Sequence, residues 1–576
     1  MPTPALTRFR IREFELDAAT GELRKAGTLV KLQPQPFRVL LLLVERAGQL
    51  VTRDEIQRCL WTDSTFVDFE HGINFSINQI REALEDDAEK PRYVETLPRL
   101  GYRFVAQVEE VNEDAAGMNT EASIAVLPFA NMSADPENEF FADGITEEII
   151  NALTRIEKLR VAACKSAFSF KGKHVDLHII GERLNVKTIL EGSVRKSGNR
   201  IRIMVQLINV ADGYHLWAES YDRELKEIFE VQDEVALAIV SRLKVALRAG
   251  QQPSMKAGTS NLEAYQLYLK GRALLYRRGL DIRRAAQCFE RAVALDPQYP
   301  LAWSGLADAR TSLSLSGLER PGAVLPQAKE AATRAVALDP MLAETHCSLA
   351  MIHVLHDWDW SKAEQEFLRA LELNPRYLQN LTWYAFYLTW VQGRVDEGIA
   401  LAKQAVEYDP LSGHAHATLA NAYYCAGRGA EAVVAANSAR ELEESFFVYW
   451  ASQHAFHSDC QFERAAAVGE ITLALSGRHP WAMASQALIF ADWGKTADAQ
   501  GLFKELVARS ARGYIQPTQL ARTASAAGES DLAVDYAREA FDIRDPFLVV
   551  AKYCPDFMRL REDPRFNDIL AQMGLR

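Results

Sequence analysis

The stretch DFEHGINFSINQIREAL, residues 68–84, decides how the first part of the chain folds. Its apolar residues recur at helical spacing and form one narrow stripe, namely Ile73, Ile77, Ile80 and Leu84. The other positions turn mostly polar side chains outward, namely His71, Asn74, Phe75, Asn78, Gln79 and Arg81. We therefore predict a helix over residues 71–85 that buries one stripe and exposes a hydrogen-bonding face.

The sequence after this helix, YVETLPRLGYRFVA at residues 93–106, predicts a β-hairpin. A strand over 93–96 and a strand over 102–106 flank a turn that carries Pro98 and Arg99. A helix followed by a hairpin with a basic tip is the arrangement of a winged helix. A hydrogen-bonding helix face without a catalytic partner suits the reading of base edges in a major groove. We therefore expect this part of the chain to bind double-stranded DNA.

The residues upstream predict the rest of such a domain. Residues 36–47 form an expected helix that ends at Gly48, where a C-cap glycine fits. Thr52 and Glu55 make a capping box that opens a second helix, and residues 61–67 follow it as a long loop. At the start of the chain, residues 8–14 and 22–30 predict a small antiparallel sheet around the turn 18–21.

A sheet, three helices and a hairpin in this order resemble the OmpR/PhoB-type winged-helix domain over residues 1–107. The stretches DFEHGINFSINQIREAL and ETLPRLGYRF are most similar to the CadC-like one-component regulators of that class. The resemblance and the outward helix face together give these predicted DNA-contacting residues: His71, Asn74, Ser76, Asn78, Gln79, Arg81, Thr96, Arg99 and Arg103. Members of the family often carry arginines where this chain has Asn78 and Gln79. Amides can pair with adenine, but they weaken the phosphate contribution to binding.

A winged helix that binds protein instead of DNA is the alternative interpretation. Positive and negative charges nearly cancel within residues 1–108, so the segment lacks an obvious basic footprint. The whole chain carries a net charge of −12, which would repel DNA from most of its surface.

The composition predicts several globular domains without a membrane anchor. A chain of 576 residues should hold three or more domains. CadC-like regulators carry a transmembrane helix after the winged helix, whereas this chain has the acidic stretch VEEVNEDAAGMNTEAS at residues 108–123. That stretch predicts a flexible linker over 109–121. The seven cysteines form no CxxC pair and suit a reducing cytoplasm, so we expect a cytoplasmic protein with no membrane contact.

Residues 122–250 alternate predicted strands and helices, which indicates an α/β domain. The run IAVLPF at 124–129 is typical of a strand buried on both faces, and residues 188–194 and 200–209 predict a hairpin. The segment resembles the TolB-N-like domain found in such regulators and in some adenylate cyclases. Asp143-Gly144 either caps a helix or binds an anion at its N-terminus. The segment contains no phosphate-binding loop and no candidate catalytic residue, so we expect neither an enzyme nor a cofactor.

Residues 261–576 repeat one motif. It appears as ERAVALDP (290–297), TRAVALDP (333–340), LRALELNP (368–375) and KQAVEYDP (403–410). A helical-hairpin period of this kind resembles the tetratricopeptide family and implies an all-α superhelix with a concave groove. Six aromatic residues either fill gaps between hairpins or line a groove for a protein or peptide partner: Trp383, Tyr384, Tyr387, Trp390, Tyr423 and Tyr424. Histidine pairs such as His454 and His457 have no clear third ligand, so we expect no metal site.

The sequence as a whole predicts a multidomain protein. An α+β winged helix spans residues 1–108, a linker 109–121, an α/β domain 122–250 and an all-α tetratricopeptide domain 261–576. Its expected function is transcription regulation, with the second and third domains sensing a ligand or protein partner. The family resemblance implies that the loop 61–67 can contact RNA polymerase, and a second copy of the chain is a further expected partner. A repeat-based scaffold whose winged helix does not bind DNA is the alternative.

Overall fold

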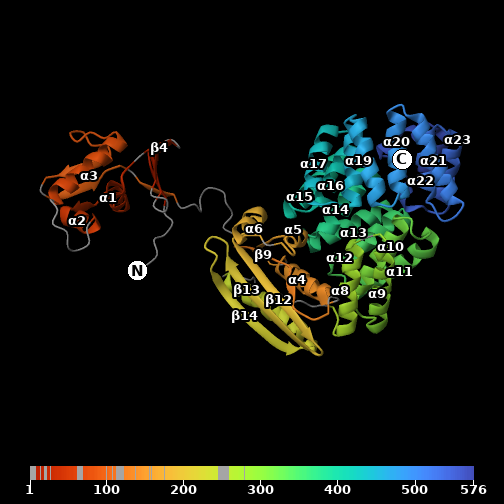
Figure 1. Ribbon diagram of the computed structural model, residues 1–576, viewed down its shortest axis with the longest axis horizontal. Coiled ribbons are helices and arrows are strands. Elements are labelled where there is room, and N and C mark those ends of the chain that lie inside the picture. Colours follow the sequence, from red (N-terminus) through yellow and green to blue (C-terminus); the bar gives the residue numbers. More distant parts are fainter. Residues whose placement is uncertain are drawn as a thin grey trace. The chain divides into compact units, whose positions relative to one another are not determined.

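The computed structural model describes residues 8–12, 14–17, 22–25, 28–30, 32–60, 69–98, 100–106, 108–111, 122–135, 138–154, 156, 159–173, 175–243, 258–277 and 279–575. The chain folds into two compact units, Met1–Glu121 and Ala122–Arg576, and each is described by itself. Figure 1 shows the elements of both units.

The first unit begins with an antiparallel sheet whose strand order is β4-β3-β2-β1-β8. Its strands are β1 (Arg8–Ile11), β2 (Phe14–Asp17), β3 (Glu22–Lys25), β4 (Thr28–Val30) and β8 (Glu109–Val111). The turn expected at 18–21 lies outside the described residues. Strand β8 occupies the first residues of the stretch predicted as a linker, because they pair with β1 from Arg8↔Val111 to Arg10↔Glu109.

Three helices follow as predicted, namely α1 (Pro34–Glu45), α2 (Arg53–Leu60) and α3 (Phe69–Leu84). The four stripe residues of α3 are buried in one core with residues such as Leu40 and Phe104. Helix α1 ends two residues earlier than predicted, and Gly48 lies beyond it with a left-handed φ of 82°. The Gly48 amide donates to the Phe104 carbonyl at 2.8 Å, so this glycine joins α1 to the hairpin.

The second unit opens with a mixed sheet of order β11-β9-β12-β13-β14, with β10 paired to β12. Its strands are β9 (Ala122–Val126), β10 (Ala130–Asn131), β11 (Leu159–Val161), β12 (Thr188–Ser197), β13 (Arg200–Asn209) and β14 (His215–Glu224). The accompanying helices are α4 (Glu139–Thr154), α5 (Cys164–Phe168), α6 (Leu177–Leu184), η3 (Leu225–Glu227) and α7 (Ile228–Arg242). Strand β9 is buried on both faces, because Val126 packs with α4 and α7 while Ala125 packs with α6.

The expectation for Asp143-Gly144 was wrong. Both residues lie inside α4, which begins four residues earlier, so they neither cap the helix nor form its N-terminus. Gly144 instead permits a close approach between helices, since a Cβ there would lie 2.5 Å from a methyl carbon of Leu269.

Helical hairpins in series fill the rest of the second unit, as the repeat period predicted. Their helices are α8 (Leu262–Arg277), α9 (Asp281–Leu295), α10 (Pro300–Leu315), α11 (Pro321–Leu338), α12 (Ala343–Ile352), α13 (Trp360–Leu373), α14 (Leu378–Phe386), α15 (Val395–Tyr408), α16 (Gly413–Cys425), α17 (Gly429–Leu442), α18 (Phe446–Ser458), α19 (Phe462–Leu475), α20 (Pro480–Asp492), α21 (Thr496–Ser510), α22 (Pro517–Ala527), α23 (Ser530–Asp542), α24 (Met558–Arg561) and α25 (Pro564–Gln572). Short turns of other helix types are η4 (His353–Asp357), η5 (Tyr387–Val391), η6 (Pro546–Val550) and η7 (Pro555–Phe557).

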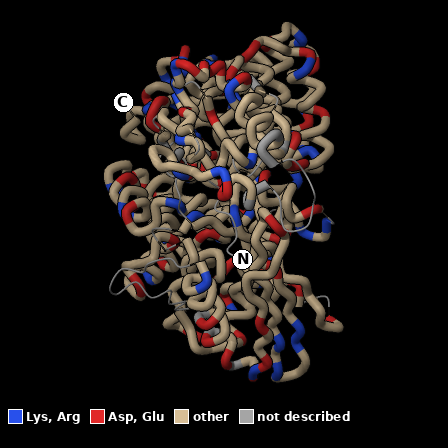
Figure 2. Tube along the Cα trace, turned by 90° about the vertical axis from the view of Figure 1, so that its left-hand side faces the viewer, with Lys and Arg blue, Asp and Glu red and all other residues tan. Residues whose placement is uncertain are grey.

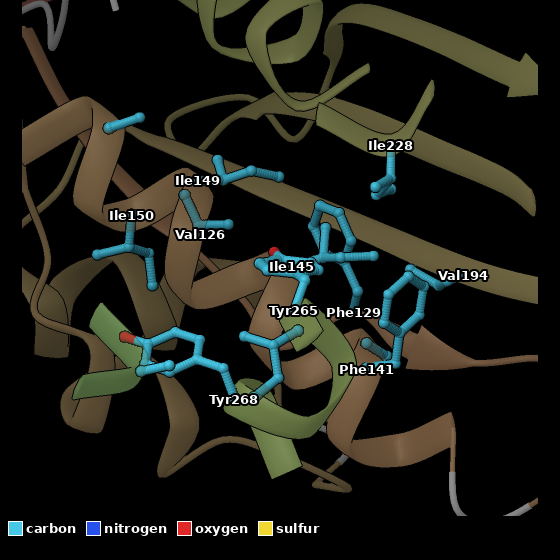
Figure 3. Close-up of a cluster of buried hydrophobic side chains, with 14 of the residues drawn as sticks. Val126, Phe129, Phe141, Ile145, Ile149, Ile150, Val194, Ile228, Tyr265 and Tyr268 are labelled. Carbon is cyan, nitrogen blue, oxygen red and sulfur yellow. The ribbon is translucent and has the colours of Figure 1, made fainter. Parts of the chain in front are cut away.

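The α/β part and the repeats form one compact unit, although the sequence predicted them as separate domains. Tyr265 and Tyr268 of α8 complete a buried apolar cluster with Ile145 and Ile149 of α4 (Figure 3). Polar contacts continue the interface further along the repeats. The Ser166 amide donates to Asp409 Oδ1 at 3.0 Å, and the Leu411 amide donates to Ser166 Oγ at 3.0 Å. The Asp-Pro turn that marks a repeat in the sequence therefore also holds the α/β part.

The repeat array also closes on itself. Gln516 Nε2 donates to the Leu315 carbonyl at 3.2 Å, and His479 Nε2 lies 2.9 Å from the Ser316 carbonyl oxygen. Residues of η6, η7 and α25 share one buried cluster with Tyr384, Tyr387, Trp390 and Tyr424. Tyr423 is buried in a neighbouring cluster, while Trp383 is partly buried. Five of the six aromatic residues therefore fill the interior, and they do not line an open groove.

Candidate nucleic-acid interface

The candidate interface is built from α3 and from a small sheet of order β5-β7-β6. Its strands are β5 (Leu50–Thr52), β6 (Val94–Leu97) and β7 (Gly101–Phe104). Strand β7 passes so close to β5 that a Cβ at Gly101 would lie 2.1 Å from the Val51 carbonyl oxygen. Only glycine fits there, because any side chain would push the two strands apart.

Helix α2 is held by the capping box that the sequence predicted. The Thr52 amide donates to Glu55 Oε2 at 2.8 Å, and the Glu55 amide donates to Thr52 Oγ1 at 3.3 Å. Arg46 Nη1 also donates to Glu55 Oε1 at 2.7 Å. The backbone hydrogen bond from Thr52 and the Arg46 guanidinium lower the pKa of Glu55 to about 2.

The outward face of α3 agrees with the prediction at several positions. Asn74 and Asn78 are exposed, and Gln79 is half-buried. Phe75 is 48% exposed, which is unusual for a side chain of its size. Such a face offers amide donors and acceptors together with one apolar ring, a combination that suits base edges and thymine methyl groups.

Ser76 was wrongly predicted to contact DNA. It is 1% exposed, and its hydroxyl donates to the Gly72 carbonyl oxygen at 3.0 Å within the helix. Ser76 lies three residues after Ile73 and four before Ile80, so helical geometry places it on the buried stripe. Because its side chain is polar, the apolar pattern of the sequence did not reveal this burial.

Arg81 joins the last turn of α3 to the wing. Its Nη2 donates to the Val94 carbonyl at 3.0 Å and to Thr96 Oγ1 at 2.7 Å. Two of the predicted residues, Arg81 and Thr96, therefore contact each other. Arg81 therefore links the end of α3 to strand β6.

Asn74 is fixed in a similar way near the start of α3. Its Oδ1 accepts from the Tyr102 hydroxyl at 3.0 Å and from Arg53 Nη1 at 3.4 Å. The Arg53 guanidinium also lies over the Tyr102 ring, 5.4 Å from its centroid. With Oδ1 so engaged, the Asn74 amide group is oriented by strand β7. Sequence analysis missed Arg53 and Tyr102, because their role depends on contacts between residues far apart in the chain.

Asp86 is a further residue that the sequence analysis missed. Its carboxylate accepts backbone hydrogen bonds from Arg92 at 2.6 Å, Tyr93 at 3.2 Å and Val94 at 2.7 Å. These bonds set the turn by which the chain passes from α3 into β6. The only local feature of the sequence that could have predicted this turn is the position of an Asp shortly after a helix.

The remaining predicted residues have different environments. Arg103 Nη1 lies 3.6 Å from Glu95 Oε2, its cross-strand partner in the β6–β7 register. This partial neutralisation leaves less positive charge on the wing for phosphates. Arg99, the side chain of His71 and the loop 61–67 lie outside the described residues.

Two other kinds of feature concern the described part of the chain, a metal cluster and a membrane span. No three His, Cys, Asp or Glu side chains gather there in a way that could hold a metal ion. Among the helices described, none combines the length and apolar character that crossing a bilayer requires.

Comparison with known families places two domains in the chain. Residues 27–104 match the family described as transcriptional regulatory protein, C terminal. Residues 120–238 match the family described as HilA/YgeH-like transcriptional regulator, second domain.

Individual relatives cover different shares of the chain. A protein of Rhizobium meliloti that carries the name "Putative adenylate cyclase 3" is 46% identical over 34% of this chain and 32% of its own length. The transcriptional regulator HilA of Salmonella typhimurium is 23% identical over 68% of each chain. The transcriptional activator CadC of Escherichia coli is 26% identical over 18% of this chain and 20% of its own. The chain thus spans about a third of the length of the first relative and two thirds of the second.

These matches confirm the predicted winged helix and assign the middle segment to a regulator family. Residues 27–104 therefore form an OmpR/PhoB-type DNA-binding domain, and residues 120–238 form a HilA/YgeH-like second domain, as found in transcriptional regulators.

Proposed function

We propose that the protein regulates transcription by placing α3 in the major groove of promoter DNA and the β6–β7 wing against the flanking backbone. The observation that carries this proposal is the exposed amide-rich face of α3, which Arg81 and Asn74 fasten to the wing. Asn78, Gln79 and His71 are the proposed readers of base edges. Thr96, Arg99 and Arg103 are the proposed contacts to phosphates, and Arg81 and Asn74 keep these two groups in register.

The second unit has the proposed role of a cytoplasmic sensor that is not itself an enzyme. Its α/β part and repeats share one core, so a ligand or protein partner bound to either would affect both. The repeat interior is filled by the chain's own η6, η7 and α25. A protein partner therefore binds the outer surface or displaces this segment. RNA polymerase is the proposed partner of residues 61–67.

The test is binding of the full chain to its own upstream DNA, titrated against salt, beside a random duplex of equal length. Sequence-selective and salt-sensitive binding is expected, with a preference of about 10³-fold or more over the random duplex. Equal affinity for both duplexes would contradict the proposal and favour the repeat-based scaffold.

A further inference from the structure

Strand β14 forms one edge of the sheet in the second unit. It is a long strand of 10 residues and pairs with β13 on one side only. Within the described part of the second unit, the opposite side of β14 has no strand partner. Long open edges invite pairing with another strand, and natural proteins usually shorten, bend or cover them.

The regular part of this edge runs from Trp217 to Glu224. The pairing with β13 is continuous there, from Leu207↔Trp217 to Arg200↔Glu224, and a register shift interrupts it at its other end. Trp217 and Tyr221 are buried beneath the edge, whereas Ala218, Glu219 and Ser220 are exposed. The strand is therefore regularly paired along this whole stretch, and residues 218–220 on its edge are open to solvent.

We propose that β14 pairs antiparallel with β14 of a second copy of the chain, with Tyr221 on the two-fold axis. In this register Glu219 lies opposite Arg223 of the second copy, and the symmetry repeats the pair. Ser220 lies opposite Asp222, so a hydroxyl donor meets a carboxylate. Directly opposed residues share one face of an antiparallel pair and lie close enough to interact.

The charges along β14 favour this register over the other antiparallel registers of the strand with its copy. Placing Glu219, Asp222 or Arg223 on the axis would set two like charges directly against each other, which is destabilising. Placing Ser220 on the axis would leave every charge on the strand opposite an uncharged residue. Only the Tyr221 register sets opposite charges against each other.

The charged residues concerned have contacts within their own copy, but Glu219 and Arg223 remain exposed. Arg223 is 43% exposed, and its contacts with Glu227 and Glu234 in its own copy are long, at 4.0 and 3.8 Å. Glu219 is exposed while it accepts from Trp217 Nε1 at 3.1 Å and from the Tyr221 hydroxyl at 3.3 Å. Asp222 pairs with Arg200 and Arg202 at 2.6 Å. Figure 2 shows how positive and negative residues are distributed along the chain.

The experiment is sedimentation of the full chain over a range of concentrations, for the parent, Glu219→Arg and Arg223→Glu. The parent should be dimeric, and each variant should raise the dimer Kd roughly tenfold or more, because like charges then face each other twice. An equimolar mixture of the two variants should recover the dimer, since the charge introduced in one chain would face the opposite charge introduced in the other. Misfolded variants could not do so.

Two control variants make the same charge changes away from the edge, Glu182→Arg on α6 and Arg195→Glu on β12. Both should sediment as the parent does. A parent that stays monomeric at concentrations on the order of 100 μM would overturn the proposal. It would also be overturned if the variants dimerise like the parent, or if the folded variants fail to recover a dimer when mixed. Sedimentation does not depend on DNA binding. A failure of the dimer proposal can therefore be told apart from a failure of the proposed DNA-binding function.

Discussion

Arg81 Nη2 donates to Thr96 Oγ1 at 2.7 Å, which ties the end of the candidate recognition helix to the first strand of the wing. The same nitrogen donates to the Val94 carbonyl at 3.0 Å. Helix and wing can therefore approach DNA as one rigid body.

Replacing Arg81 with alanine should weaken specific DNA binding without unfolding the domain. The change removes one partly buried hydrogen bond, to the Val94 carbonyl, and one exposed hydrogen bond, to Thr96 Oγ1. Each contributes about 1 kcal/mol or less, and their loss frees the wing to move. Gel-shift titration and circular dichroism of the full chain measure the two effects. Thr96→Val, which removes only the acceptor hydroxyl, should give a smaller loss of affinity. Unchanged affinity in both variants would show that this link does not position the helix.

Base-reading and phosphate-contacting residues should respond differently to substitution. Gln79→Ala should cost about 1–3 kcal/mol on the specific site and leave random DNA unaffected, because an amide reads a base edge. Arg99→Ala should weaken binding to every sequence and reduce the salt slope by about one. Salt titrations on specific and random duplexes distinguish the two patterns. Identical patterns for both variants would contradict the assigned roles.

The repeat interior should lose stability as the pH falls from 6.5 towards 4. His454 is 1% exposed, with Nε2 3.0 Å from Ser485 Oγ, and burial lowers its pKa from 6.5 to about 4. As the pH falls, His454 takes up a proton at a higher pH in the unfolded chain than in the folded one. The free energy of unfolding therefore decreases by up to about 1.4 kcal/mol per pH unit within this window. Thermal melts across the window should show a shallower pH dependence in His454→Gln. The exposed His178→Gln serves as the control and should follow the parent.

Asp556 should be needed for closure of the repeat array. It is fully buried, pairs with Arg522 and accepts from the Tyr424 hydroxyl, and Arg522 helps to lower its pKa to about 2. Asp556→Ala would leave Arg522 buried without its carboxylate, at a cost of about 3–5 kcal/mol. Hydrogen exchange of residues 546–575 should rise in this variant. The double variant Arg522→Met/Asp556→Leu should restore much of the protection. Equal exchange rates in the double variant and in Asp556→Ala would show that the buried, unpaired Arg522 is not the cause of the loss.

Sequence alone determined the features that depend on residues a few positions apart. The stripe from Ile73 to Leu84, the capping box of Thr52 and Glu55, and the repeated Asp-Pro turns are such features, because helical and turn geometry acts over short separations. The matched domain families agree with the winged helix inferred from these local patterns. The exposed positions of Asn74 and Asn78 followed from the same periodicity.

Only the tertiary structure decided what joins these pieces. The contacts of Arg81 with Thr96, of Ser166 with Asp409 and of Gln516 with Leu315 link residues 15, 243 and 201 positions apart. Ser76 and Asp409 are polar, so the pattern of apolar residues in the sequence does not predict that they are buried. Their partners come from distant segments, so burial and pairing were fixed only when the chain packed.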